Sequence, residues 1–220
     1  MEVNGIDLSE LKKPFSLDSI HWRIGSINKE KTSGIALAYL DARDVMERLD
    51  DVFGMEGWQC RYPHANSKTC CEIGAWLGED HGWIWKANGA GDTNFEAEKG
   101  AFSDSFKRAA VLWGIGRYLY DMPSIWVDLA PGGRKIKNDQ YVKLAKALER
   151  LTTHSSDSGS KAVHEWFRQA PTEMKGCPSM DKLQEWWVIN TPFIKSLSDA
   201  DKGILDQQKD MLKIQLEKAA

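Results

Sequence analysis

The chain has 220 residues, of which 42% are hydrophobic and 28% charged, a balance typical of a soluble globular protein. This length predicts one sizeable domain with an appendage. The formal net charge of −3 argues against a polyanion binder that relies on overall basic charge, although a few Lys or Arg residues in one place can still hold phosphates. No apolar run approaches 18 residues, and the acidic N-terminus lacks the apolar region of a secretory signal, so we expect neither a membrane span nor export.

The first half of the chain alternates between strand and helix patterns. Period-two alternation of apolar and polar residues marks the strands, and short turns between the last three predict an antiparallel meander. In chain order we expect a short helix at Leu8–Lys13, a hairpin of Leu17–Asn28 with Gly34–Leu40, a helix at Asp41–Phe53, and strands at Trp58–Ala65, Thr69–Leu77 and Gly82–Ala87.

The stretch from Asp92 to Tyr120 carries the clearest helical pattern. Thr93 and Glu96 form a capping-box pattern at its start, in which each side chain satisfies a backbone N–H near the other. Gly114 and Gly116 weaken its end. The residues on its apolar face, at spacings of seven, four, three and four, are Phe95, Phe102, Phe106, Ala109 and Trp113.

A polar ridge runs beside that apolar face. Lys99, Ser103 and Lys107 recur at steps of four, and Arg108 lies further round with Asp104 one turn before it, a possible ion pair. This helix is therefore expected to pack against another part of the protein with one face and to offer Lys107 and Arg108 near the border of that face. A core helix with solvated charges would show the same pattern.

The second half of the chain is predicted to be mostly helical. Residues 123–137 read as a loop and Asn138–Leu151 as a helix. We expect an α+β core at 1–152, a linker at 153–179 that is Ser-rich at first and poorly ordered between Pro171 and Pro178, and a small helical module at 180–220. That module is either a packing or dimerising helix pair or a docking site for a nuclease or a single-strand binding protein.

Enzyme signatures are missing from the sequence. There is no phosphate-binding P-loop, no His-Glu-x-x-His and no Cys-x-x-Cys, so we predict no cofactor and no metal site. The four cysteines fit a reducing cytosol. Glu72, Glu79 and Asp80 are acidic, but two of them lie in a turn, and solvated charge explains them better than Mg²⁺ ligation.

What remains is a binding function. Arg23 lies on a strand face with His21, and Arg61 and Lys86 lie on strand faces opposite tryptophans. If these cations line one groove with the long helix, they could hold the phosphates of a single strand while leaving its bases free. Arg23 could equally be a solvated or cross-strand paired residue.

The run Ser103–Gly114 resembles the signature helix of the Rad-fifty-two family of single-strand annealing proteins. Three more segments resemble that family in the same order, and together the matches cover residues 8–120. They are the strand Ile20–Arg23, the strand and helix start Ala38–Val45, and the Phe-Gly-x-x-Gly-Trp junction Phe53–Trp58.

The resemblance implies a hairpin and a three-stranded meander packed on the long helix. It implies that Lys107, Arg108 and Arg23 contact single-stranded DNA phosphates in an inner groove, and that Tyr39 contacts the DNA, although Tyr39 could also be a sheet aromatic. A further family Arg is replaced here by Val111. It also implies a closed homo-oligomeric ring, annealing without ATP, no enzyme activity, and a phage or prophage protein acting in the cytoplasm.

Three rivals remain beside annealing. A protein that coats single strands would bind DNA without accelerating pairing. A metal-dependent nuclease would cleave DNA with Mg²⁺. A purely structural oligomer would show no salt-sensitive DNA binding.

Overall fold

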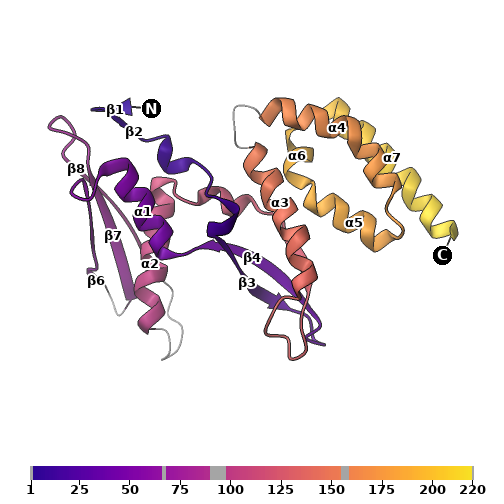
Figure 1. Ribbon diagram of the computed structural model, residues 1–220, viewed down its shortest axis with the longest axis horizontal. Coiled ribbons are helices and arrows are strands. Elements are labelled where there is room, and N and C mark those ends of the chain that lie inside the picture. The colour runs from indigo at the N-terminus through magenta and orange to yellow at the C-terminus, as the bar shows by residue number, and fades with distance from the viewer. Residues whose placement is uncertain (1, 66–67, 90–97, 155–158, 220) are drawn as a thin grey trace. The chain divides into compact units, whose positions relative to one another are not determined.

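The computed structural model describes residues 2–65, 68–89, 98–154 and 159–219 (Figure 1). The chain divides into two compact units. The first unit holds Met1–His21 and Tyr39–Leu119, and the second holds Trp22–Ala38 and Tyr120–Ala220. Helices and antiparallel sheets both occur, which confirms the α+β class.

The first unit is built on the predicted antiparallel meander. Its strands are β5 (Trp58–Arg61), β6 (His64–Ala65), β7 (Lys68–Trp76) and β8 (Trp83–Gly89), and β7 pairs with the other three. The single strand expected at residues 58–65 is instead two, because Pro63 lies between β5 and β6 and has no N–H to donate to a ladder.

Two helices cover one face of this sheet, α1 (Ala42–Phe53) and α2 (Glu98–Trp113) (Figure 1). Asp41 and Asp44 form a capping box at the start of α1. The Trp113 indole N–H at the end of α2 donates to the backbone carbonyl of Ile73, at 3.1 Å, which ties helix to sheet. The sheet residues buried on this face are Cys71, Ile73 and Ala75.

The long helix ends where its glycines predict. After Trp113, Gly114 and Gly116 adopt positive φ angles of 103° and 64°, and a 3₁₀ turn, η3 (Arg117–Asp121), follows. The predicted capping box of Thr93 and Glu96 lies outside the described residues.

The opening of the chain is less helical than expected. A small hairpin of β1 (Glu2–Val3) and β2 (Ile6–Asp7) precedes η1 (Glu10–Lys12), and η2 (Leu17–Ser19) follows. The helix predicted at residues 8–13 is thus only a 3₁₀ turn, since Pro14 disfavours the helical conformation of the residue before it. The Arg48 guanidinium on α1 donates to the carbonyls of Glu10 and Lys13, which holds this turn in place.

A second sheet has the order β3 (Ile20–Ile27), β4 (Ser33–Leu40), β9 (Ile125–Asp128). The hairpin of β3 and β4 is as predicted. The assignment of residues 125–128 to a loop was wrong, because they pair with β4, where Ala36 lies opposite Ile125. Ile125 and Val127 are buried and Trp126 and Asp128 exposed, an alternation of only four residues.

The remaining second-unit elements are helical: η4 (Asn138–Gln140), α3 (Tyr141–His154), α4 (Gly159–Lys175), α5 (Met180–Ile189), α6 (Thr191–Ser196) and α7 (Asp199–Ala219). Most of the stretch predicted as a linker is therefore helix α4. Helical spacing buries Val163, Trp166, Ala170 and Met174 along α4, and this packing outweighs the presence of Pro171. Within the predicted C-terminal module, Pro192 in the first turn of α6 marks the break between α5 and α6.

Candidate nucleic-acid interface

Lys107 on α2 and Tyr39 on β4 are brought together in the first unit. The ammonium nitrogen of Lys107 lies 5.2 Å from the centroid of the Tyr39 ring, within the range of a cation–π contact. The His21 ring lies beside the same tyrosine, with 5.5 Å between ring centroids. His21 is exposed, whereas Lys107 and Tyr39 are half-buried. Two of the predicted DNA contacts thus form one cationic and aromatic cluster with His21.

Arg108 lies on the exposed side of α2 beside Asp104. Its Nε lies 2.9 Å from the Asp104 carboxylate, and both side chains are 49% exposed. The predicted ion pair is therefore present. A phosphate that contacts Arg108 has to compete with this carboxylate, in a pair that water screens.

Two further predicted DNA contacts, Arg23 and Lys99, lie on strand β3 and at the start of helix α2. Arg23 is exposed on β3, two residues after His21 and therefore on the same side of that strand. Lys99 belongs to the first turn of α2, and its side chain lies outside the part of the chain that the structure describes.

Arg61 points away from α2. Its guanidinium carbon lies 4.0 Å from the centroid of the Trp85 ring, and it forms an ion pair with Glu72. Trp85 lies flat against Gly74 on its other side, since a Cβ at Gly74 would meet the indole at 2.7 Å. The indole is thus held between backbone and cation.

Lys86 lies on the opposite, α2-facing side of the same sheet. Its ammonium donates to the carbonyl of Leu112, at 3.0 Å, and lies 4.3 Å from the Trp113 ring centroid. Burial lowers the pKa of Lys86, and the charges of Arg117 and Lys12 lower it further. The structure therefore does not bring Lys86 and Arg61 to one face, although the sequence suggested a shared groove.

Local sequence patterns missed two of these neighbours. Arg117 donates to the carbonyls of Val111 and Leu112, and Lys12 packs against Gly114. Both positions depend on how the chain folds back on the end of α2. Strand alternation had already placed His21 on the face of Arg23, but its contact with the Tyr39 ring was not predicted.

Among the described side chains, no group of three or more His, Cys, Asp or Glu residues is placed to hold a metal ion. Glu72 is committed to its ion pair with Arg61. Burial raises the pKa of the Cys71 thiol to about 12, so it is a poor nucleophile. In the same described part, no helix is both long and apolar enough to cross a membrane.

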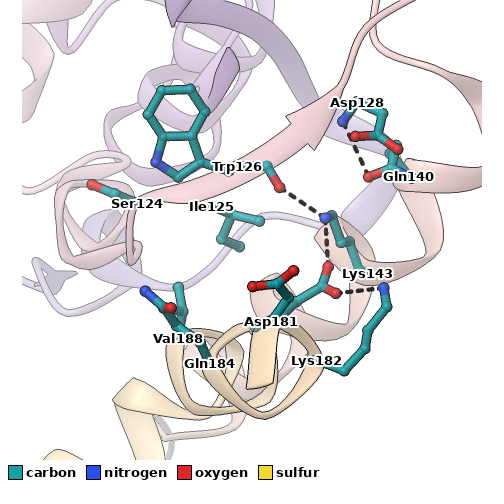
Figure 2. A pocket seen from close by; sticks show the side chains of 11 residues that line it. Ser124, Ile125, Trp126, Asp128, Gln140, Lys143, Asp181, Lys182, Gln184 and Val188 are labelled. Carbon is teal, nitrogen blue, oxygen red and sulfur yellow. Dashed lines mark hydrogen bonds and ion pairs between the residues drawn. The ribbon is translucent and has the colours of Figure 1, made fainter. Parts of the chain in front are cut away.

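The second unit carries a hollow between β9, α3 and α5 (Figure 2). Lys143 lies at its centre and donates to the Trp126 carbonyl, at 2.7 Å, and to Glu185. Glu185 also accepts from Lys182, at 2.8 Å. Burial opposes the ionisation of Glu185, but the hydrogen bonds from both lysines outweigh it and lower the pKa of this carboxyl. Because Lys143 and Lys182 are both paired with Glu185, these three residues form a structural ion-pair network in the hollow.

Two known proteins resemble the chain over about half of its length. A protein named single-stranded DNA-binding protein DdrA, from Deinococcus radiodurans, is 35% identical over 124 residues, which cover 54% of this chain and 56% of that protein. The DdrA of Deinococcus deserti is 38% identical over 120 residues, covering 53% and 58%. The chain thus spans little more than half the length of these relatives.

Residues 7–73 and 71–136 match the sequence profile described as Rad52/22 family double-strand break repair protein. These two segments cover more than half of the chain and include β3, β4, α1, the meander and α2. They also contain every residue of the cluster around Tyr39. The chain therefore belongs to the Rad52/22 family of double-strand break repair proteins.

Proposed function

We propose that the chain binds single-stranded DNA at the cluster of His21, Tyr39 and Lys107 and at Arg108, the next residue of α2, and anneals complementary strands in recombination and double-strand break repair. The observation that carries this proposal is the Lys107–Tyr39 contact beside Arg108. A cation and an aromatic face at one place suit a strand, since the cation attracts phosphate and the ring accepts a stacked base.

The chemistry needs no nucleotide and no metal. Two cations on adjacent α2 positions hold phosphates without reading bases. A strand held by its phosphates keeps most base edges free for a complement. Pairing then supplies about 1.4 kcal/mol per stacked step, so no ATP is required. Arg23, two residues after His21 on β3, stays a predicted phosphate contact.

Assembly into a closed ring belongs to the same proposal. A single head-to-tail interface repeated until it closes would join the binding surfaces of neighbouring copies into one path for a long strand. The C-terminal helices are candidates for docking a nuclease or a single-strand binding protein. A phage or prophage origin and action in the cytoplasm stay predictions.

Coating of single strands without annealing is the second candidate. The name of the DdrA relatives, single-stranded DNA-binding protein, favours it, because that name states binding alone. Both functions use the same contacts and differ in whether the bound strand remains free to pair.

The test is the rate at which two complementary labelled oligonucleotides pair, with and without the protein and with no nucleotide or Mg²⁺. We expect strong acceleration that Lys107→Gln combined with Arg108→Gln abolishes. The control is Arg168→Gln with Lys175→Gln, an exposed Arg and Lys on α4 that make the same change in net charge. Binding without acceleration would establish the coating function, and equal loss in both double variants would reject the site.

A further inference from the structure

Three cations gather at the C-terminal end of α2, and we call Lys12, Lys86 and Arg117 the α2 C-terminal cluster. They come from η1, from β8 and from η3, three separate parts of the first unit. Lys12 and Arg117 are exposed and Lys86 is half-buried. No local sequence pattern links them, so the cluster exists only in the fold.

Two members of the cluster share one hydrogen-bond acceptor. The Lys86 ammonium and the Arg117 guanidinium both donate to the carbonyl oxygen of Leu112, at 3.0 and 2.9 Å. Because both bonds end on the same atom, the two charged groups lie within about 6 Å of each other. Lys12 lies close by, since a Cβ on Gly114 would meet its Cγ at 2.9 Å. The lowered pKa of Lys86, caused first by burial and then by Arg117 and Lys12, agrees with this crowding.

The cluster lacks a matching negative charge. In the described part of the chain, none of its three side chains forms an ion pair with a carboxylate, and the Lys12 side chain makes no hydrogen bond there. Carbonyls at a helix C-terminus carry about half a negative charge in total. Capping α2 therefore explains Lys86 and Arg117 in part, but it leaves about two and a half positive charges uncompensated and does not account for the charge of Lys12.

The cluster lies next to Arg108 along the same helix. On β8, Asn88 donates to the carbonyl of Arg108, and Lys86, two residues away, donates to the carbonyl of Leu112. Four residues separate these carbonyls, so the cluster lies one helical turn, about 6 Å, beyond the Arg108 backbone. A strand that contacts Arg108 can therefore continue onto the cluster without leaving α2.

We propose that the α2 C-terminal cluster binds backbone phosphates of the same single strand as Arg108, beyond Arg108 along α2. Within the described residues the Lys12 ammonium forms no hydrogen bond or ion pair, so its charge is the one most available to a phosphate. This inference rests on the proposed function and extends its binding surface to the end of α2. Cations of this kind act through charge and carry no sequence preference.

The test compares Lys12→Gln with Lys13→Gln. The two lysines are neighbours, both are exposed, and each change lowers the net charge by one, but Lys13 pairs with Glu10 at 2.6 Å and lies outside the cluster. Binding of a labelled oligo-dT is measured between 50 and 300 mM salt, about the range over which phosphate contacts weaken. A plot of log affinity against log salt has a negative slope. Loss of one single-strand phosphate contact makes that slope less steep by about 0.7, which corresponds to about fivefold weaker binding at 0.1 M salt.

We expect this loss for Lys12→Gln and an affinity and slope close to those of the unchanged protein for Lys13→Gln. If the unchanged protein binds and both variants bind equally well, the cluster is not a phosphate site, and the proposed function stands. If the unchanged protein does not bind single strands at all, the proposed function fails and this inference fails with it.

Discussion

The ammonium of Lys107 lies 5.2 Å from the centroid of the Tyr39 ring, so a helix residue and a strand residue far apart in the chain form one contact. The ring holds the cation near the border of α2, where a phosphate can reach it. The same ring can accept a base on its exposed part, since Tyr39 is only half-buried. Both roles need an aromatic side chain, and neither needs the tyrosine hydroxyl.

Two substitutions of Tyr39 should therefore separate the contribution of its aromatic ring to DNA binding from that of its hydroxyl. We expect Tyr39→Phe to bind single strands nearly as well as the unchanged protein. Tyr39→Leu should lose about 1 to 3 kcal/mol of binding free energy, the usual contribution of one base–aromatic stack, which is roughly a 5- to 150-fold loss of affinity. Fluorescence anisotropy with a labelled oligo-dT measures it. Unchanged binding by Tyr39→Leu would remove Tyr39 from the interface.

The ion pair between Arg108 and Asp104 predicts that removing the Asp104 carboxylate raises the affinity for single-stranded DNA. Asp104→Asn removes a carboxylate that competes with phosphate for Arg108 and also removes one repulsive charge. Exposed pairs of this kind contribute about 0.2 to 1 kcal/mol, so affinity should rise by up to about fivefold at low salt. Asp80→Asn, an exposed turn residue of the same unit, is the control, and a similar gain there would indicate a general charge effect.

The features of the fold that depend on residues close in sequence could be predicted. Alternation along β7 separated buried Cys71, Ile73 and Ala75 from the opposite face, and positive-φ glycines end α2 as their residue type predicts. The family resemblance named Lys107 and Tyr39 separately as DNA contacts. Their contact with each other was not predicted, since no local spacing connects a strand at residue 39 with a helix at residue 107.

Tertiary contacts explain where sequence reasoning was wrong. The short strand β9 has only four residues, too few for its alternation to stand out, and its pairing with β4 defines it. Pro171 suggested disorder, yet buried Trp166 and Met174 on either side of it hold α4 together. Arg61 and Lys86 alternated correctly along their strands, but their partners, Trp85 and the carbonyl of Leu112, required the folded chain.

Gly74 is the position in the meander where added volume should be most harmful. A Cβ there would come within 2.7 Å of three atoms of the Trp85 ring, which is itself held by Arg61. We expect Gly74→Ala to cost about 1 to 3 kcal/mol of unfolding free energy through overpacking. At Gly89 in neighbouring β8, a Cβ would meet only the Thr69 carbonyl, at 3.5 Å, so Gly89→Ala is the matched control. Urea denaturation measures both, and equal stabilities would mean that Trp85 moves aside freely.

The carboxyl of Glu185 in the second unit should make stability depend on pH. Burial disfavours its charged form, but hydrogen bonds from Lys143 and Lys182 outweigh burial and lower its pKa below the ordinary value of 4.5. Because the folded-state pKa is the lower one, the stabilisation is fully present above about pH 4.5 and is lost as the pH falls through the folded-state pKa.

Glu185→Gln should therefore cost about 1 to 3 kcal/mol at pH 7, the usual contribution of hydrogen bonds to a charged group. The cost should be smaller at about pH 3 than at pH 7, because below the ordinary pKa of 4.5 the unfolded chain binds a proton at this carboxyl and the advantage of the folded state decreases. Urea denaturation at both pH values measures the difference, with Glu217→Gln on the exposed side of α7 as the control. A cost that is the same at pH 7 and pH 3 would show that the carboxyl contributes through packing and that its charge is unimportant.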